Sequence, residues 1–261
     1  MSSIKIIFLI SFLFVFSFLS TANAKVQTKP ITYKYEGVNL KGYLAWDDAV
    51  KGKRPGILVV HEFWGLNAYA KRRAEQLAGL GYVAFAADMY GDGKTTAHPE
   101  EAMAMMETVK KNITLWRGRA NEALKILKSQ KTVDEKRMAG IGYCFGGATV
   151  LQLAYAGTDL KAVVSFHGAL SIPESTKDIK ARLLILQGEK DPYVKPETIQ
   201  ELKKTLDQGK VDYKFISYPG AVHSFTVKEA GDDPSKGLAY NAEADQKSWD
   251  EMKILFDEVL K

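Results

Sequence analysis

The chain of 261 residues has a single cysteine, Cys144, and only four histidines. One cysteine cannot form a disulfide within the chain, and it cannot build a thiolate-rich zinc or iron–sulfur site. Blocks of like charge are also absent, and the formal net charge is only +5, so the sequence indicates no nucleic-acid surface. These absences leave open why a chain of this length keeps one thiol.

The composition is that of an ordinary globular protein, with 46% hydrophobic and 26% charged residues. These fractions exclude a disordered chain, collagen and a coiled coil. No low-complexity linker, internal repeat or break in composition divides the sequence. We expect one domain over residues 25–261, long enough to bury a large core.

Residues 1–24 are typical of a secretory signal peptide. Lys5 precedes an apolar run, Ile6–Leu19, and Ala22-Asn23-Ala24 matches a cleavage site. The run of 14 residues is shorter than the roughly 18 that span a bilayer, although a retained membrane anchor is the alternative. We expect a periplasmic or secreted protein without stable membrane insertion after cleavage.

Strand and helix patterns alternate along the rest of the chain. Two strands around Gly37 alternate apolar with polar residues, as an antiparallel hairpin does. The later strands are short buried runs separated by helices, which predicts an α/β protein with a doubly wound, mostly parallel sheet and helices on both faces. The expected strands are 31–36, 39–46, 57–60, 82–87, 137–143, 162–166, 182–187 and 213–218. The expected helices are 67–80, 99–128 with an interruption near 116–118, 146–156, 196–208 and 246–260.

The segment Gly140–Gly147, with the sequence GIGYCFGG, lies where a strand ends and a helix begins. It places Cys144 at the centre of Gly-x-Nuc-x-Gly, the nucleophile elbow of hydrolases. Gly142 and Gly146 would let strand and helix approach closely around a strained residue. The sulfur would face the N-terminus of the helix, which favours thiolate over thiol.

Two other interpretations of this segment are a structural turn with an inert cysteine and a dinucleotide-binding loop. The third glycine of a dinucleotide loop is misplaced, at Gly146. The nearest acid, Asp159, precedes the next strand, where a ribose-binding acid would end it. Both observations argue against a nucleotide site.

Two later loops supply an acid and a histidine. Asp191 follows the strand at 182–187, and His223 follows the strand at 213–218. An α/β-hydrolase needs nucleophile, acid and histidine in this order, each after a strand. Because the carboxyl ends of parallel strands meet at one edge of a sheet, we expect the three to lie together. Singly, Asp191 could cap a turn and His223 could be a surface histidine.

With these motifs, the sequence resembles the dienelactone hydrolases (carboxymethylenebutenolidases) of the α/β-hydrolase fold, over nearly all of residues 25–261. The resemblance implies that Cys144 is the nucleophile, His223 the base and Asp191 its orienting carboxylate. It also implies a hydrolase of small esters or lactones that needs no cofactor. The matching motifs are His61–Asn67, Asp88–Gly91, Gly142–Gly147, Gly188–Pro192 and Gly220–Phe225.

Glu62 follows the buried strand at 57–60, on the loop that supplies an oxyanion donor in this fold. In dienelactone hydrolases the matching glutamate contacts the resting thiol and helps to activate it when substrate arrives. The alternative is a solvated carboxylate at a strand end. The backbone N–H groups of Phe63 and Phe145 are the expected oxyanion hole.

The sequence departs from the family where substrate identity is decided. Bacterial dienelactone hydrolases carry two arginines, at the positions that hold Asp92 and Val227 in this chain. Two cations that would clamp a substrate carboxylate are therefore missing, and the sequence identifies no substrate-binding residue. Arg117 or Arg119 could substitute, although nothing in the sequence places either in the site.

Other residues at strand ends indicate less. His61, His98 and His167 do not form a metal set, since His61-Glu62 lacks the second histidine of a zincin helix. His167, Asp88 and the aromatic residues Trp64 and Trp116 could line a pocket or pack the core. The alternatives to an enzyme are a non-catalytic small-molecule binding protein on a hydrolase scaffold and a thiol oxidation sensor, which lacks a resolving cysteine.

Overall fold

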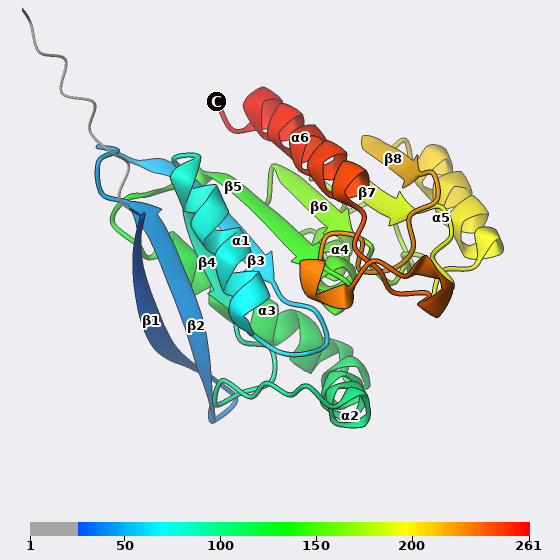
Figure 1. Ribbon diagram of the computed structural model, residues 1–261. Coiled ribbons are helices and arrows are strands. Elements are labelled where there is room, and N and C mark those ends of the chain that lie inside the picture. Colours follow the sequence, from blue (N-terminus) through cyan, green and yellow to red (C-terminus); the bar gives the residue numbers. More distant parts are fainter. Residues whose placement is uncertain (1–25) are drawn as a thin grey trace, which may run out of the picture.

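The computed structural model describes residues 26–261, so the predicted signal peptide lies outside the described residues. Eight strands form one sheet in the order β1-β2-β4-β3-β5-β6-β7-β8 (Figure 1). β1 pairs antiparallel with β2, and β2 pairs antiparallel with β4; every other pair is parallel. The strands are β1 (Val26–Tyr35), β2 (Val38–Asp47), β3 (Arg54–Val60), β4 (Val83–Ala87), β5 (Val133–Tyr143), β6 (Ala162–Phe166), β7 (Arg182–Gly188) and β8 (Tyr213–Tyr218).

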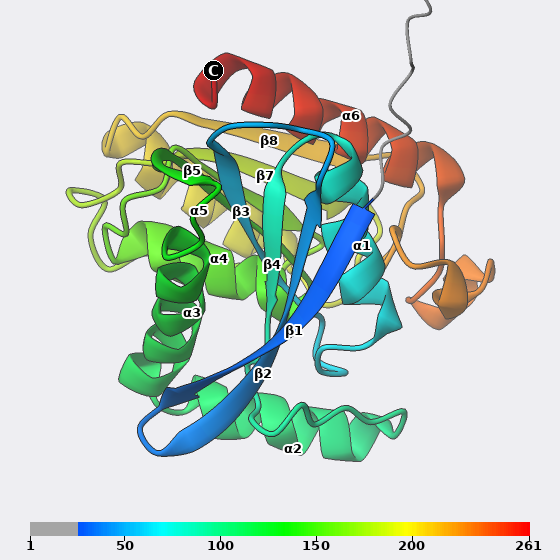
Figure 2. The same ribbon diagram turned by 90° about the vertical axis from the view of Figure 1, so that its left-hand side faces the viewer.

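Helices cover both faces of this sheet, as Figures 1 and 2 show together. The α-helices are α1 (Ala68–Gly79), α2 (Pro99–Lys110), α3 (Ile113–Lys128), α4 (Phe145–Tyr155), α5 (Pro196–Gln208) and α6 (Ala242–Val259). Two short 3₁₀ helices, η1 (Lys228–Ala230) and η2 (Pro234–Lys236), precede α6. None of the helices among residues 26–261 combines the length and the apolar character that crossing a membrane requires.

Alternation along the strands divides the core into two layers. In β3, Leu58 and Val60 belong to the core layer that includes residues of α3, α4 and α5, whereas Ile57 and Val59 belong to the layer that includes residues of α1 and α6. Successive side chains of a strand point to opposite faces of the sheet, and here both faces are covered. This explains why β3 and β4 are unbroken apolar runs.

One predicted boundary is wrong. The interruption of the helical segment lies at Lys111–Asn112 and not near residues 116–118. The Asn112 side chain accepts hydrogen bonds from two amides of the first turn of α3, so it starts a new helix. Gly118 lies inside α3, and a Cβ there would be 1.9 Å from the hydroxyl oxygen of Tyr35, which explains why this helical position holds a glycine.

Three elements begin four or five residues earlier than the sequence predicts. β1 starts at Val26, which pairs with Asp47 across the hairpin. β5 starts at Val133, which pairs with Arg54 before a register shift. α6 starts at Ala242, where the Asn241 side chain caps the helix. In each case polar or charged residues join the element because a neighbouring segment supplies the partners.

Candidate active site

Cys144 lies between the last residue of β5 and the first residue of α4. Its backbone has φ 53° and ψ −113°, a region that residues with a side chain rarely occupy. The Cys144 N–H donates to the carbonyl of Phe166 at 3.0 Å, which ties the turn to β6. The strain is therefore held by the surrounding sheet, as is common at functional sites.

The glycines around Cys144 are required by close backbone contacts. A Cβ on Gly142 would lie 2.0 Å from the carbonyl oxygen of Gly146, and a Cβ on Gly146 would lie 2.1 Å from that of Val60. Strand β5, helix α4 and the end of β3 thus meet at this turn. The glycines at positions 142 and 146 are therefore explained by this close contact.

His223 and Asp191 come together from loops that follow β8 and β7. His223 Nδ1 lies 2.8 Å from Asp191 Oδ2. The same oxygen accepts from Gln187 Nε2 at 2.5 Å, and Oδ1 accepts from the amide of Tyr193 at 2.9 Å. The carboxylate is thereby fixed against the imidazole. Gln187 was not predicted, and its only signal is its position at the end of a strand.

The protonated form of His223 is favoured in this setting. Burial acts to lower the pKa of the imidazole, but Cys144 and the Asp191 carboxylate raise the pKa well above its usual value. Because Nδ1 faces Asp191, Nε2 is the nitrogen left to face the thiol. Asp191, His223 and Cys144 form an electrostatically coupled set.

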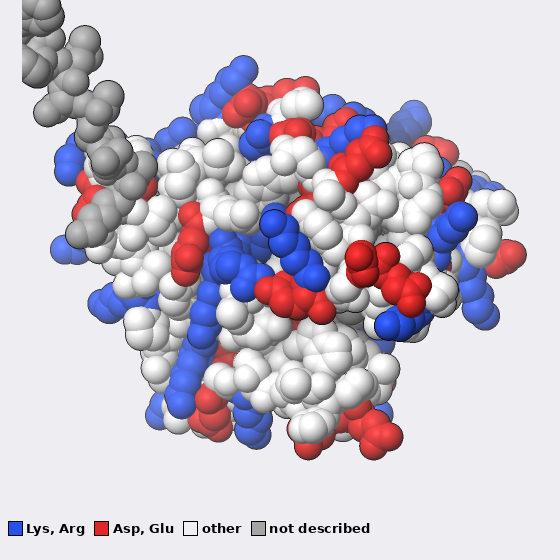
Figure 3. All heavy atoms as spheres, in the orientation of Figure 1, with Lys and Arg blue, Asp and Glu red and all other residues white. Residues whose placement is uncertain are grey.

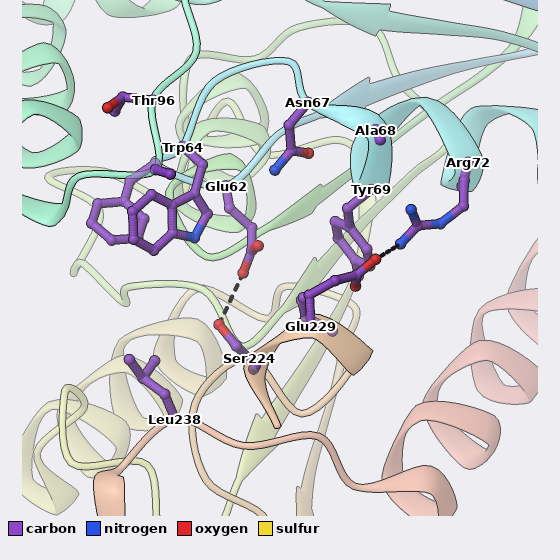
Figure 4. Close-up of a pocket in the computed structure, with 14 residues that line it drawn as sticks. Glu62, Trp64, Asn67, Ala68, Tyr69, Arg72, Thr96, Ser224, Glu229 and Leu238 are labelled. Carbon is purple, nitrogen blue, oxygen red and sulfur yellow. Dashed lines mark hydrogen bonds and ion pairs between the residues drawn. The ribbon is translucent and has the colours of Figure 1, made fainter. Parts of the chain in front are cut away.

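Glu62 is buried, with 3% of its surface exposed. Its Oε1 accepts a hydrogen bond from the hydroxyl of Ser224 at 2.9 Å (Figure 4). Burial raises the pKa of the Glu62 carboxyl, while the Ser224 hydroxyl and His223 limit the rise. Glu62 is therefore not a solvated carboxylate. Ser224, with φ 55°, was not singled out in the sequence, although it directly follows His223.

His61 holds the loop that carries Glu62 and Phe63. Its Nδ1 donates to the Glu62 carbonyl at 2.5 Å, and its Nε2 accepts from the amide of Met89 at 3.2 Å. Burial lowers the pKa of His61 to about 4, so the ring is neutral. The bond to the Glu62 carbonyl orients the peptide that contains the Phe63 N–H. Tyr90 Oη also donates to the Phe63 carbonyl at 2.9 Å.

Phe145 is the first residue of α4, so its N–H has no partner within the helix. Its side chain is buried and stacks on Trp116, with ring centroids 5.7 Å apart. Trp116 Nε1 in turn donates to Thr149 Oγ1 at 2.8 Å. Trp116 therefore packs behind the elbow and does not line the cavity described below.

A buried polar chain fixes the loop after His223. Thr226 Oγ1 lies 2.7 Å from His167 Nε2 and 2.5 Å from the Tyr69 hydroxyl. Arg73 Nε donates to that hydroxyl at 3.2 Å, and Arg73 Nη2 donates to the Thr226 carbonyl at 3.0 Å. The ring of His167 packs edge-on against His223, with centroids 5.2 Å apart. His167 thus supports the His223 loop from β6.

A cavity of about 400 Å³ adjoins the site. Glu62, Phe63 and Ser224 form its inner wall, and Figure 4 shows Arg72 on α1 opposite Glu229 of η1, joined by an ion pair. Apolar groups dominate the rest of the lining. The full lining is Glu62, Phe63, Trp64, Asn67, Ala68, Tyr69, Arg72, Thr96, Ala97, Ser224, Val227, Glu229, Ala230 and Leu238.

The two family arginine positions differ in their surroundings. Val227 is buried and lines the cavity, whereas Asp92 is exposed in the turn after β4. Neither of the arginines considered as substitutes reaches the cavity. Arg117 donates to Gln152 Oε1, and Arg119 donates to the Met89 carbonyl. Arg72, which the sequence did not single out, is the arginine in the lining.

Asp88 has a structural role. Its carboxylate accepts from the backbone amides of Lys41, Tyr90, Gly91 and Gly93, so it fixes the turn after β4. His98 is exposed at the start of α2. In the part of the chain from 26 to 261, no group of three or more His, Cys, Asp or Glu side chains is arranged to hold a metal ion. Figure 3 shows side chains of both charge signs next to one another across one face.

Comparison with known proteins adds to this geometry. Residues 40–260 match the model of the "Dienelactone hydrolase family". The solved structure "m3DLH" is 40% identical with a TM-score of 0.87, and the match covers 90% of this chain and 99% of that chain. A crystal structure of a dienelactone hydrolase-like promiscuous phosphotriesterase from metagenomic libraries is 38% identical with a TM-score of 0.86, over the same shares.

A similar protein from a named organism is "Protein usf" of Aquifex pyrophilus. It is 28% identical over 241 residues, which cover 88% of this chain and 98% of that protein. The predicted resemblance and the predicted α/β-hydrolase fold are confirmed. The chain belongs to the dienelactone hydrolase family and is an ester or lactone hydrolase.

Proposed function

We propose that the protein is an exported hydrolase of small esters or lactones that uses Cys144 as a covalent nucleophile. The observation that carries the proposal is the coupled set of Cys144, His223 and Asp191, with Cys144 in a strained turn and a 2.8 Å bond between His223 and Asp191. Nucleophile, base and orienting acid in this relation are the requirements for acyl transfer.

In the first half of the reaction His223 Nε2 holds the proton of Cys144, and the Sγ thiolate attacks the substrate carbonyl carbon. The carbonyl electron pair moves to the oxygen, where the N–H groups of Phe63 and Phe145 bind the oxyanion. Collapse of this intermediate breaks the C–O bond, and the leaving alkoxide takes the proton from His223. A lactone opens at this step, and the product alcohol stays attached to the acyl group.

In the second half, water gives a proton to His223 Nε2 as it attacks the thioester. The C–S bond then breaks, the carboxylic acid leaves and Cys144 regains its resting state. One water molecule is consumed for each ester bond. Asp191 keeps the imidazole in the tautomer that each transfer needs.

The role proposed for Glu62 is to activate the thiol when substrate enters. Its support is the position of the carboxyl, which is buried at the inner wall of the cavity and bonded to Ser224, the neighbour of His223. A substrate that disturbs the bond to Ser224 would release a buried carboxylate beside the site. We expect Glu62→Gln to lower kcat more than it changes KM.

The test compares the hydrolysis of p-nitrophenyl acetate and small lactones by the protein and by Cys144→Ala. We expect loss of turnover in the variant and an acyl adduct on Cys144 by mass spectrometry after rapid quenching. Equal rates in the two proteins would contradict the proposal. A binding protein on the same scaffold would bind esters without turnover, and its thiol would react with iodoacetamide no faster than a free cysteine at neutral pH.

A second candidate activity is the cleavage of phosphotriesters by the same thiol. It is favoured by the 38% identical structure that is described as a promiscuous phosphotriesterase. Attack of Sγ on phosphorus would expel the alkoxide or phenolate, and water would then cleave the S–P bond. The test is release of p-nitrophenolate from paraoxon, with Cys144→Ala as the control.

Export is a separate part of the proposal, supported by the signal-peptide pattern at residues 1–24. We expect the mature protein to begin at Lys25 and to accumulate in the periplasm or the medium. Intact-mass measurement of the protein from each cell fraction tests this. A full-length chain retained in the membrane fraction would show that the segment stays as an anchor.

A further inference from the structure

The charged side chains that line the cavity are few. Of its 14 lining residues only Glu62, Arg72 and Glu229 carry a charge, and Arg72 is the one cation among them. Glu62 lies at the inner wall near His223, and Arg72 and Glu229 lie opposite one another (Figure 4). Away from Cys144 and His223, these three residues are therefore the ones in the lining that can attract or repel a charged group of the substrate.

Arg72 and Glu229 join two separate elements across the cavity. Arg72 projects from α1 and Glu229 from η1, and their side chains are 49% and 58% exposed. The guanidinium also lies over the ring of Tyr69, 5.9 Å from its centroid. Residues that are both half-exposed and part of the lining stand at the rim, where a substrate must pass or where its distal end must rest.

The ion pair with Glu229 neutralises Arg72, the one cationic side chain of the cavity lining. With Glu229 on Arg72, a carboxylate at the distal end of a substrate would meet an occupied guanidinium, and it would also face the negative charge of Glu229. Val227 adds no charge at the buried wall. Like charges in one site disfavour binding, whereas a free guanidinium would favour it.

We infer that the Arg72–Glu229 pair is a specificity determinant that selects uncharged acyl groups over acyl groups with a terminal carboxylate. Glu229 withholds Arg72 from the substrate, and Arg72 offsets the charge of Glu229, so apolar contacts decide binding. This inference rests on the proposed hydrolase function, since it concerns the substrate of the same site.

The experiment uses two p-nitrophenyl esters of equal chain length, the hexanoate and the hemi-adipate, at neutral pH and low ionic strength. The measured quantity is the ratio of kcat/KM for the hemi-adipate to that for the hexanoate, after subtraction of the rate with Cys144→Ala. We expect wild type to prefer the hexanoate. We expect Glu229→Gln to raise the ratio by about twofold to tenfold and Arg72→Gln to lower it by a similar factor. The double variant should return the ratio to near the wild-type value.

Glu258→Gln is the matched control. Glu258 forms an ion pair with Arg182, and its side chain is 50% exposed, close to the value for Glu229. Arg182 is the first residue of β7, so this pair lies at the opposite edge of the sheet from Cys144. The substitution makes the same change in net charge, and we expect the ratio to stay unchanged.

Three results overturn the inference while the proposed function stands. These are a wild-type preference for the hemi-adipate, an unchanged ratio in Glu229→Gln, and an equal change in Glu258→Gln, which would be an effect of net charge alone. If neither ester is hydrolysed faster than by Cys144→Ala, the proposed function itself fails and the specificity inference fails with it.

Discussion

His61 and His223 lie on two loops at the same edge of the sheet, and both are buried. Their pKa values nevertheless shift in opposite directions. His61 has a backbone carbonyl and a backbone amide as partners, and burial lowers its pKa to about 4. His223 has the Asp191 carboxylate and Cys144, which raise its pKa well above the usual value in spite of burial. The hydrogen-bond partner, and not burial, therefore decides whether a histidine in this site orients a loop or carries a proton.

The substitution that should most strongly remove the difference between the two histidines is Asp191→Asn. It gives His223 a neutral partner, as His61 has, and allows the wrong tautomer. We expect kcat/KM for p-nitrophenyl acetate to fall by about 10³- to 10⁴-fold. Steady-state kinetics measure this, and a loss of less than tenfold would show that Asp191 does not orient the base.

The same variant has a signature in stability. A histidine whose pKa is raised on folding contributes stability that is present below its unfolded pKa and is lost as pH rises through the folded pKa. Wild type should therefore lose stability on the alkaline side, and Asp191→Asn should lose less. Urea unfolding as a function of pH measures the difference.

The largest effect on stability is expected for His61→Leu. The change leaves the Glu62 carbonyl and the Met89 amide without their partner in a buried place, which costs about 2–4 kcal/mol. His223→Leu should cost less, because Asp191 keeps the donors Gln187 and Tyr193. Urea unfolding compares the two variants, and a greater loss in His223→Leu would reverse the roles assigned to the two histidines.

The lowered pKa of His61 also predicts how stability changes at acid pH. Between the usual histidine pKa of about 6.5 and the lowered pKa of about 4, the unfolded chain binds a proton that folded His61 does not. The free energy of unfolding should therefore fall as pH falls through this window, by up to about 3 kcal/mol from this group. His61→Leu should lack this part of the slope. An identical acid slope in both proteins would contradict a neutral, buried His61.

The smallest expected effect concerns His167, a third buried histidine between the two loops. Thr226→Val removes the hydroxyl that joins His167 to Tyr69, and we expect a loss of about 1–2 kcal/mol in stability. Because Thr226 is on the His223 loop, kcat should also fall several-fold. Thr108→Val on exposed α2 is the control and should change neither quantity.

Much of the site could be predicted from sequence because it is coded by local pattern. The glycines around Cys144 report a backbone contact that admits no side chain, and strand ends locate Asp191 and His223. The predicted interruption of the helix at residues 116–118 was wrong because Gly118 reads as a helix breaker. The glycine is instead required by the Tyr35 hydroxyl, which packs against it from β1, far away in the chain.

The partners of the site residues were not predictable in the same way. Ser224 bonds to Glu62 and His61 accepts from the Met89 amide, and in both cases the partner comes from a different loop. Gln187 is only four residues from Asp191, but the loop after β7 must turn back for the two side chains to meet. No local pattern distinguishes such a glutamine or serine from an ordinary polar residue. The two candidate arginines, Arg117 and Arg119, bond to Gln152 and to the Met89 carbonyl, whereas Arg72 reaches the cavity from α1.

Two features of the site follow from the sequence alone: the single cysteine lies in a glycine-lined turn between a strand and a helix, and an acid and a histidine follow it in hydrolase order. These features depend on backbone geometry within short segments and on the order of the segments along the chain, and both can be read from the sequence. The charge states of the side chains, in contrast, depend on the folded structure. Whether His61 is neutral, His223 protonated or Arg72 paired depends on burial and on partners brought from distant segments, because electrostatic energies are set by distance and dielectric and not by position along the chain.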